Sequence, residues 1–463
     1  MPTITRKIEL KLCTEGLSDE ERKAQRGLLY HINDNLYKAA NNISSKLYLD
    51  DHVSSMVRLK HAEYLTLLSE LEKAKKKDDE ELIAELGNRV SVTEKEMTDQ
   101  ELAICKYATE MSTDTLAYRF ANEIEINVFG QILACLKQGI HSNYKKDAAD
   151  VKRGERSIRN FKKGMPIPFP WSKSIRIENE GSDFYLRWYN GLRFRFDFGK
   201  DRSNNRLIVS RCLNLDPEYE GEYKLSNSSL QMVKRDGSTK LFLLLVVNIP
   251  QGNVELNKKI VVGVDLGINS PAYVATNVTM ERQQIGRRDT FLNARMAIQR
   301  RFKSLQKLQN TAGGRGRKKK LEPLERLRET ERNWVRTQNH LFSRDVVQFA
   351  VKTRAATIHL EDLSGFGKDD DGNADEKKEF VLRNWSYYEL QTMIKYKAAK
   401  YGIKVEKIRP AYTSRTCSWC GQPGFRQGEI FICENPECEK HGKKENADYN
   451  AARNIANSTD IIK

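Results

Sequence analysis

The sequence contains no long hydrophobic segment. Its longest purely apolar run, LFLLLVV at 241–247, is far shorter than the roughly 18 residues that a membrane-spanning helix needs. The first ten residues, MPTITRKIEL, lack the apolar centre of a secretory signal peptide, and no internal repeat is present. With 39% hydrophobic and 31% charged residues, the chain is too apolar to be disordered. We therefore expect a soluble intracellular protein of 463 residues, with about three domains at roughly 150 residues each.

Without a secretory signal, the eight cysteines are not expected to form disulfides. Four of them lie far apart among apolar neighbours and are predicted to be small core residues: Cys13, Cys105, Cys135 and Cys212. The other four follow the pattern C-x2-C, twelve intervening residues and C-x4-C: Cys417, Cys420, Cys433 and Cys438. Four thiolates at this spacing can close a tetrahedral site, which predicts one structural Zn²⁺. His441 is an alternative ligand, although a surface histidine is the simpler interpretation.

Acidic residues are outnumbered by basic residues in the later part of the chain. Residues 1–150 carry 21 basic and 26 acidic side chains, whereas residues 151–463 carry 58 and 37, and the whole chain has a net charge of +16. This asymmetry favours a polyanionic partner over a merely solvated basic surface. The basic runs predict contacts with nucleic acid at Lys152, Arg153, Arg156, Arg159, Lys162, Lys163, Lys318, Lys319 and Lys320.

Proline is rare in the early part of the chain, and the pattern there is helical. Residues 4–12 alternate polar and apolar side chains, which indicates a first β-strand. Ser18 and Glu21 then have the spacing of a helix capping box. The sequence that follows is rich in Leu, Ala, Glu and Lys. We assign 1–18 to the first strand of a barrel and 19–160 to a helical domain.

The pattern changes at PIPFPW (166–171), because alternating prolines exclude a helix. Two hairpins are predicted next, with two-residue turns at Asn190–Gly191 and Asp236–Gly237. We assign 161–257 to an antiparallel β-barrel that the N-terminal strand closes, so that the helical domain is an insertion in it. An aromatic stripe on the first hairpin is either barrel core or a base-stacking platform, and core is the preferred interpretation.

Arg193 and Arg195 alternate with the aromatic stripe of the first hairpin and lie on the opposite strand face. They are therefore predicted to contact nucleic acid. Arg415, beside the cysteine cluster, is a further candidate for such a contact, although side chains around the cysteines can instead pack a small ribbon that lacks a core.

From residue 258 onward the pattern is that of an α/β domain, and three acidic residues stand at the ends of its elements. Asp265 ends the apolar strand VVGVD, Glu361 ends the strand TIHLE, and Asp448 begins the last helix. Carboxylates that converge at one end of a sheet can hold two Mg²⁺ ions roughly 3.5–4 Å apart, one activating water and one stabilising the leaving oxygen of a phosphodiester. Each acid alone is more simply a turn or cap residue. Asp362 faces away from Glu361, because successive strand residues point to opposite sides.

Several of these segments resemble the split RuvC nuclease and inserted zinc ribbon of the TnpB family, which includes RNA-guided transposon nucleases and the type V CRISPR effectors. The segments are VVGVDLGINSPAYVATN, IHLEDLSG, WSYYELQTMIKYKAAKYGIKV, TSRTCSWCG and ADYNAARNIAN. The resemblance is specific over residues 258–463 and rests on architecture alone over 1–257.

What the resemblance implies is a multidomain α+β protein. A helical recognition domain is inserted in a wedge β-barrel, and an RNase H-like α/β RuvC domain follows it. The RuvC domain covers 258–411 and 446–463, and the zinc ribbon at 412–445 is its insert. Asp265, Glu361 and Asp448 would be the catalytic acids, and the chain would bind a guide RNA, recognise a short adjacent motif and cut both strands of target DNA in the prokaryotic cytoplasm.

Within the family, the chain is most similar to the miniature subtype V-F effectors, some of which act as homodimers on one guide RNA. No closely spaced cysteine pair occurs in the first 150 residues, where some members carry a zinc finger. A transposon-encoded TnpB nuclease is therefore an alternative. A guide-dependent protein that binds DNA without cutting it is another alternative, disfavoured by the intact acidic trio. A zinc-ribbon DNA-binding protein without RNA is a fourth possibility.

Overall fold

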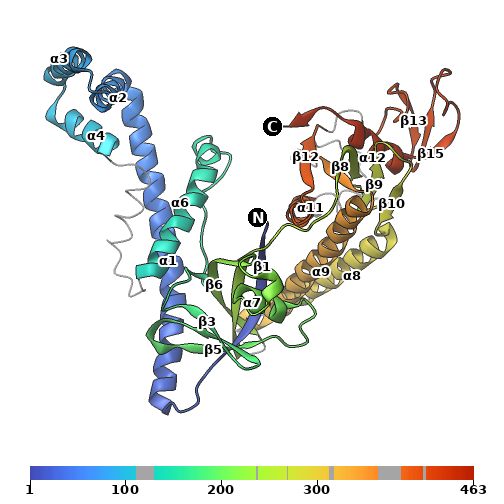
Figure 1. Cartoon of the computed structure of the whole chain (residues 1–463), viewed down its shortest axis with the longest axis horizontal. Coiled ribbons are helices and arrows are strands. Elements are labelled where there is room, and N and C mark those ends of the chain that lie inside the picture. Colours follow the sequence, from blue (N-terminus) through green and yellow to red (C-terminus); the bar gives the residue numbers. More distant parts are fainter. Residues whose placement is uncertain are drawn as a thin grey trace. The chain divides into compact units, whose positions relative to one another are not determined.

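The computed structural model describes residues 1–110, 130–235, 238–267, 270–311, 317–362, 387–409 and 413–462 (Figure 1). Contacts between residues divide the chain into two compact units. One unit comprises residues 4–248, and the other comprises residues 249–463 together with residues 1–3. The boundaries of the six segments assigned from the sequence stay a prediction. The described part of the chain contains no helix that is both long and apolar enough to span a membrane.

The first unit combines a seven-stranded sheet with a set of helices. Its strands are β1 (Thr3–Leu12), β2 (Ile167–Phe169), β3 (Arg176–Glu180), β4 (Asp183–Arg187), β5 (Arg193–Asp197), β6 (Lys224–Arg235) and β7 (Ser238–Asn248). The strand order is β2-β6-β7-β1-β5-β4-β3, and the register of β1 with β5 is antiparallel. The N-terminal strand therefore joins the sheet of the later strands, as the sequence predicts, and lies in the middle of this sheet. Closure into a barrel stays a prediction, because the ordered ladders run from β2 at one edge to β3 at the other.

Helices fill the described chain between β1 and β2. They are α1 (Asp19–Lys60), α2 (Ala62–Lys76), α3 (Glu80–Glu96), α4 (Asp99–Glu110) and α6 (Gly130–Lys152), and α7 (Asn205–Cys212) follows β5. The predicted capping box at the start of α1 is confirmed, since Ser18 accepts from the backbone of Glu21 and Glu21 accepts from the backbone of Ser18. Helices also occupy most of the described residues between 19 and 152, whereas residues 153–160, which the sequence assigned to the same segment, are not helical.

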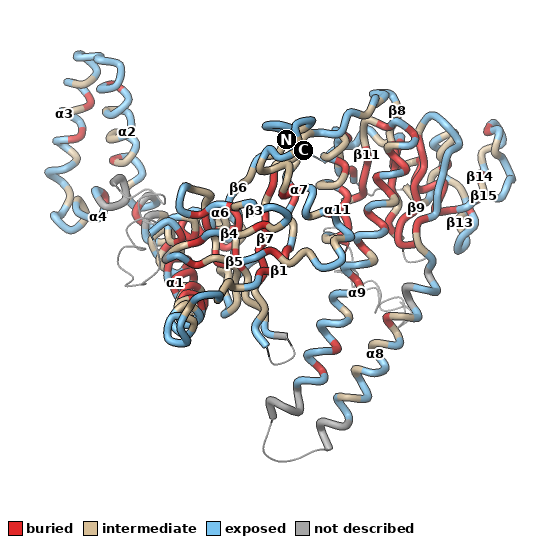
Figure 2. The backbone as a smooth tube through the Cα atoms, turned by 60° about the horizontal axis from the view of Figure 1, so that its bottom comes forward, coloured by how far each residue is buried: buried red, intermediate tan, exposed pale blue. Residues whose placement is uncertain are grey.

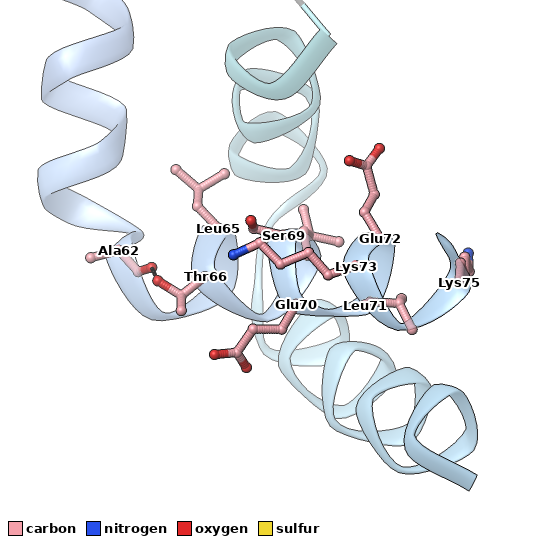
Figure 3. A pocket seen from close by; sticks show the side chains of 10 residues that line it. Ala62, Leu65, Thr66, Ser69, Glu70, Leu71, Glu72, Lys73 and Lys75 are labelled. Atoms are coloured by element: carbon pink, nitrogen blue, oxygen red, sulfur yellow. Dashed lines mark hydrogen bonds between the residues drawn. The ribbon is translucent and has the colours of Figure 1, made fainter. Parts of the chain in front are cut away.

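The α2–α3 hairpin has its own small core. Tyr64 and Val90 are buried there together with Cys105 of α4. The prediction that four scattered cysteines are core residues is confirmed for Cys105, whereas Cys13, Cys135 and Cys212 are only partly buried. A cavity of about 720 Å³ lies beside α2, and its lining includes Leu65 and Leu68 as well as charged side chains of the same helix (Figure 3). The lining comes from α2, which its neighbouring helices cover only in part, so the cavity is open to solvent.

The aromatic stripe of the first hairpin packs in the core of the sheet. Phe194 is fully buried and lies edge-on to Trp188 with ring centroids 6.4 Å apart. The predicted two-residue turn at Asn190–Gly191 is wrong in length, because residues 188–192, which include a 3-10 turn, separate Arg187 from its partner Arg193. Trp188 and Leu192 are both buried, and the longer link lets both side chains point inward. The second predicted turn, at residues 236–237, lies outside the described residues.

The second unit is built on a six-stranded mixed sheet. Its strands are β8 (Asn257–Asp265), β9 (Ala272–Thr276), β10 (Arg282–Ile285), β11 (Ala355–Glu361), β12 (Lys404–Ile408) and β16 (Ile461–Ile462), in the order β10-β9-β8-β11-β12-β16. β8, β11 and β12 run parallel, whereas β9, β10 and β16 are antiparallel to their neighbours. Buried residues concentrate in β8, β9 and β11 (Figure 2). Because β8 and β11 are parallel neighbours, their carboxyl ends lie side by side at the same end of the sheet.

Helices cover both faces of this sheet. The helices of the unit are α8 (Arg288–Thr311), α9 (Arg317–Lys352), α11 (Tyr387–Ala399) and α12 (Ala447–Asn457). Val262 and Val264 of β8 belong to the core formed with α9 and α11. Gly263 between them faces α12, since a Cβ on Gly263 would lie 2.0 Å from the backbone oxygen of Ala452. α12 therefore packs on the face opposite α9 and α11.

A small three-stranded sheet precedes α12. It consists of β13 (Gly424–Gln427), β14 (Ile430–Cys433) and β15 (Lys444–Asn446), paired antiparallel in that order. Its core contains Cys417, Cys433 and Cys438 with Phe431. We call residues 413–446 the cysteine ribbon. Because β15 runs directly into α12, the ribbon and this helix are covalently adjacent.

Candidate functional site

The three acids predicted from the sequence lie on one face of the mixed sheet. Asp265 ends β8 and Glu361 ends β11, which are neighbouring parallel strands. Asp265 is two residues after Gly263, and Glu361 is two residues after His359, whose Nδ1 lies 3.0 Å from the carbonyl oxygen of Ile455 in α12. Both carboxylates therefore point to the face that α12 covers.

Asp448 comes to the same place from α12. It is buried in the first turn of this helix, where a negative charge interacts favourably with the helix dipole. Asp362 points the other way and forms an ion pair with Lys407 at 2.8 Å. Only one member of the Glu361–Asp362 pair therefore enters the site, as the strand geometry predicts.

The three carboxylates influence one another electrostatically, although among the described residues only the cysteine sulfurs gather within 4.8 Å of one another. Burial raises the pKa of Asp265 well above its usual value, and the charges of Glu361 and Asp448 raise it further. Burial also raises the pKa of Glu361, which a hydrogen bond from Thr413 and the charge of Arg426 partly oppose. Such a site has an unmet demand for positive charge, which is the condition that a bound divalent cation satisfies.

Four side chains that sequence reasoning did not assign to this site hold the acids in place. The Thr413 hydroxyl donates to Glu361 Oε1 at 2.5 Å, and Gln391 Nε2 donates to the backbone oxygen of Glu361 at 2.8 Å. The Ser270 hydroxyl donates to Asp448 Oδ2 at 3.0 Å. Arg426 Nη2 lies 3.5 Å from Asp448 Oδ1. No local motif marks these residues, because they come from separate loops, a strand and a helix.

The four ribbon cysteines form a tight group. Their Sγ atoms all lie within 4.8 Å of one another, with Cys417–Cys438 at 4.0 Å and Cys420–Cys433 at 3.7 Å. Four sulfurs around a tetrahedral ion with ~2.3 Å bonds lie about 3.8 Å apart, so the donor set and its spacing fit a single metal ion. His441 is not a member of this group in the part of the chain that the structure describes.

Several basic residues predicted to contact nucleic acid form ion pairs within the chain. Arg156 and Arg159 both pair with the buried Asp147. The other pairs are Lys152 with Asp51 at 2.9 Å, Arg153 with Asp150 at 2.6 Å and Lys163 with Asp34 at 2.7 Å. Each of these cations is therefore partly neutralised, and their contacts with nucleic acid stay predictions.

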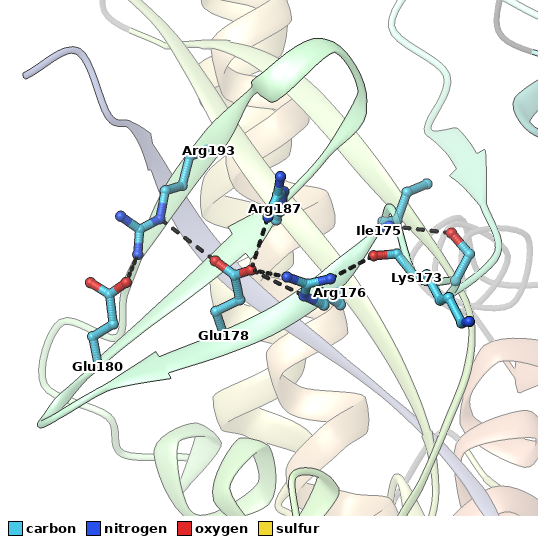
Figure 4. Close-up of polar contacts among 8 residues, drawn as sticks. Lys173, Ile175, Arg176, Glu178, Glu180, Arg187 and Arg193 are labelled. Carbon is cyan, nitrogen blue, oxygen red and sulfur yellow. Dashed lines mark hydrogen bonds and ion pairs between the residues drawn. The ribbon is translucent and has the colours of Figure 1, made fainter. Parts of the chain in front are cut away.

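Arg193 belongs to a network on the strand face of β3 and β5. Figure 4 shows Glu178 between Arg176, Arg187 and Arg193, and Arg193 also pairs with Glu180. The remaining predicted contacts, Lys162, Arg195 and Arg415, are exposed. Lys318, Lys319 and Lys320 lie within α9, but their side chains are outside the described residues. Because Lys162, Arg195 and Arg415 are exposed, they are the stronger candidates for a phosphate contact.

Comparisons with known proteins identify the family. Residues 387–455 match the family model described as "Cas12f1-like, TNB domain". The CRISPR-associated endodeoxyribonuclease Cas12f1 of Sulfoacidibacillus thermotolerans is 33% identical over 325 residues, which cover 68% of this chain and 73% of that protein. The chain belongs to the Cas12f1 family.

Two further similarities place this Cas12f1 family member among related nucleases. The putative RNA-guided DNA endonuclease InsQ of Escherichia coli strain K12 is 27% identical over 328 residues, covering 66% of this chain and 72% of that one. A solved Cas12f1 chain, from a complex with sgRNA and target DNA, matches with a TM-score of 0.64 and 18% identity and covers 99% of both chains. The last similarity shows that the fold extends over the whole chain, including the half whose assignment rested on architecture.

Proposed function

We propose that this protein is an RNA-guided DNA endonuclease that uses one carboxylate site. Its membership of a family of CRISPR-associated endodeoxyribonucleases supports the activity, and the solved relative in complex with sgRNA and target DNA supports both partners. The observation that carries the mechanism is the convergence of Asp265, Glu361 and Asp448 on one sheet edge, where the pKa of Asp265 is raised by burial and by the other two acids. A cytoplasmic location in a prokaryotic cell and a dimeric state on one guide RNA belong to the same proposal.

The three carboxylates are proposed to hold Mg²⁺. Their oxygens are the hard ligands that this ion prefers, and three carboxylates can share two ions. When bound, the ions supply an activated water and stabilise the leaving oxygen of a phosphodiester. Asp265 and Glu361 are fixed by neighbouring strands, and Asp448 is fixed by α12, so the chain itself sets the spacing of the ligands. The sheet order with β8 between β9 and β11 supports the RNase H-like assignment of the domain.

Arg426 supplies a positive charge that the protein itself brings to the site. Its guanidinium lies beside Asp448 and interacts electrostatically with Asp265 and Glu361. A guanidinium in this position can donate to a non-bridging oxygen of a phosphate that approaches the carboxylates. We propose that Arg426 contacts the scissile phosphate and helps to orient it.

The four ribbon cysteines are proposed to hold one structural Zn²⁺. All four positions of a tetrahedral ion are taken by sulfur, so no position is open for substrate or water. Because the ribbon has only a small core, the binding energy of the ion is also folding energy for this segment.

The second candidate is a transposon-encoded RNA-guided nuclease with the same chemistry. The similarity to InsQ supports it, but the identity of 27% is lower than the 33% with Cas12f1. A protein that binds DNA without cutting it, or binds without RNA, would leave the acidic cluster without a use.

The test compares substitutions of two acids, Asp265 and Asp362, whose side chains point to opposite faces of the sheet. The purified chain, loaded with guide RNA, is given a matched duplex labelled on both strands, with and without Mg²⁺. Asp265→Ala should abolish cutting of both strands and leave guide-dependent DNA binding intact, because the ions and not the nucleic acid depend on this side chain. Asp362→Ala, which removes a carboxylate on the opposite face, should cut normally. Undiminished cutting by Asp265→Ala would refute the single-site mechanism.

A further inference from the structure

The carboxylate of Glu361 is held by the base of the cysteine ribbon. Thr413, four residues before Cys417, donates its hydroxyl to Glu361 Oε1 at 2.5 Å. β11 fixes only the backbone of Glu361, with help from Gln391 of α11. A glutamate has three side-chain torsions, so its orientation depends on a partner at the carboxylate end. That partner belongs to a segment outside the mixed sheet.

Two asparagines of α12 fix this segment. Ser418 N donates to Asn450 Oδ1 at 2.8 Å, and Asn450 Nδ2 donates to the carbonyl oxygen of Thr416 at 2.7 Å. Asn454 Nδ2 donates to the carbonyl oxygens of Thr413 at 2.7 Å and Thr416 at 2.8 Å. Asn450 is only 1% exposed, so these hydrogen bonds are shielded from water. The segment 413–418 is thus attached to the helix that also carries Asp448.

The other end of the same segment is part of the thiol cluster. Cys417 contributes its Sγ to the group of four, and its backbone N–H donates to Gln422 at 2.8 Å. The backbone N–H of Gly424 donates to the carbonyl oxygen of Arg415 at 3.0 Å, which closes the loop against β13. A metal ion on the four sulfurs would hold this loop closed, and its loss would free the loop that places Thr413.

We propose that Thr413 is a positioning residue for Glu361 and that Asn450 and Asn454 couple it to the cysteine ribbon. A metal ion in the thiol cluster then strengthens the binding of divalent ions by the carboxylates. This inference rests on the proposed metal sites of the nuclease. Since coupling between two binding sites is reciprocal, an ion on the carboxylates also strengthens the hold of the ribbon on its own metal.

The first test measures Mn²⁺ binding to the zinc-loaded protein by electron paramagnetic resonance, without nucleic acid. Thr413→Val removes the hydroxyl at nearly constant volume and should weaken Mn²⁺ binding about 10-fold, the lower end of what a lost partner of a metal ligand costs. Thr413→Ser keeps the hydroxyl and should restore the wild-type affinity. The matched control is Thr392→Val, whose exposed hydroxyl donates to the backbone oxygen of Tyr388 in its own helix.

Zinc content is measured in each sample, so that a change in Mn²⁺ affinity is not caused by a lost ribbon. Asp265→Ala identifies the Mn²⁺ that binds at the carboxylates. Wild-type affinity in Thr413→Val would overturn the proposal, and so would an absence of Mn²⁺ binding that depends on Asp265. A wild-type protein that binds Mn²⁺ but never cuts DNA would instead contradict the proposed function and leave the coupling standing.

The second test measures the reciprocal effect. Release of zinc to a chelating dye is followed in the wild-type protein with and without saturating Mg²⁺. Mg²⁺ should slow the release in the wild type and in Asn457→Ala, an exposed substitution at the end of α12. It should have little effect in Asn454→Ala or Thr413→Val, because the connection is broken. Equal slowing by Mg²⁺ in all four proteins would show that the coupling does not pass through Thr413 and Asn454. No slowing in the wild type would show that the two metal sites are independent, and either result would refute the proposal.

Discussion

Gly263 is the position at which a single methyl group should disturb the site most. A Cβ built on it would lie 2.0 Å from the carbonyl oxygen of Ala452 and 2.4 Å from the backbone nitrogen of Ala456, both in α12. Ordinary contact begins at 3.4 Å, and the obstructing atoms are backbone, which cannot rotate aside. In Gly263→Ala the helix must therefore move away from β8 by about 1.4 Å, the difference between 3.4 and 2.0 Å.

This displacement has two measurable consequences. Overpacking of this kind costs about 1–3 kcal/mol of stability, so the melting temperature should fall. α12 also carries Asp448, and a ligand misplaced by about 1 Å can reduce the rate roughly 100-fold. We therefore expect slow cutting of a matched duplex at saturating Mg²⁺, with guide-RNA binding retained.

Gly87→Ala is the control for this experiment. Gly87 lies within α3, and a Cβ there would meet no atom within 4 Å. Alanine is the better helix former, so this variant should be slightly more stable, by roughly 0.5–1 kcal/mol, and should cut normally. If Gly263→Ala melts and cuts like the wild type, then α12 does not pack on β8 as described, and the geometry of the carboxylate site is wrong.

Three further predictions concern the metals and the partner. Cys433→Ser should lose zinc and unfold the ribbon locally, and metal analysis that still finds one zinc per chain would contradict the assignment. Neutralising Lys318, Lys319 and Lys320 together should flatten the salt dependence of RNA binding, whereas an unchanged slope would mean that they touch no phosphate. Asp265→Asn should raise the melting temperature of the metal-free protein at neutral pH. The raised pKa of Asp265 means that its stability contribution is fully present below the unfolded pKa of about 3.9 and is lost as pH rises through the folded value. The asparagine variant should therefore lose less stability than the wild type over that pH range. An equal loss would show that the fold does not disfavour the charged form of Asp265.

The gathering of the four ribbon cysteines could be predicted from the sequence, and so could the positions of Asp265 and Glu361 at strand ends, because local patterns indicate both; the roles of these residues stay predictions. The cysteines lie in two closely spaced pairs, a spacing typical of a metal site, so the pattern appears directly in the chain. Asp265 follows a near-continuous apolar run, the pattern of a strand buried on both faces, and Glu361 follows a strand whose apolar residues alternate with Thr357 and His359. The helical stretch before β2 and the capping box at Ser18 are likewise consequences of neighbouring residues.

Other features depend on residues that are distant in the chain. Nothing near Arg426, Thr413 or Ser270 indicates that these side chains meet the acids, since each comes from a different loop or strand. Arg156 and Arg159 form part of a basic run in the sequence, but in the fold they pair with Asp147, which α6 buries beside them. The link from β4 to β5 is longer than the Asn190–Gly191 pair predicts, because Trp188 and Leu192 both occupy the core.

The division has a physical reason. Strand alternation, helix capping and metal-ligand spacing act between residues a few positions apart, so the order of amino acids determines them. Hydrogen bonds to a carboxylate and neutralisation of a surface cation require that two segments be packed against each other. Only the tertiary structure decides those pairings, here by packing α12 on Gly263 of β8 and thereby bringing the ribbon base to Glu361.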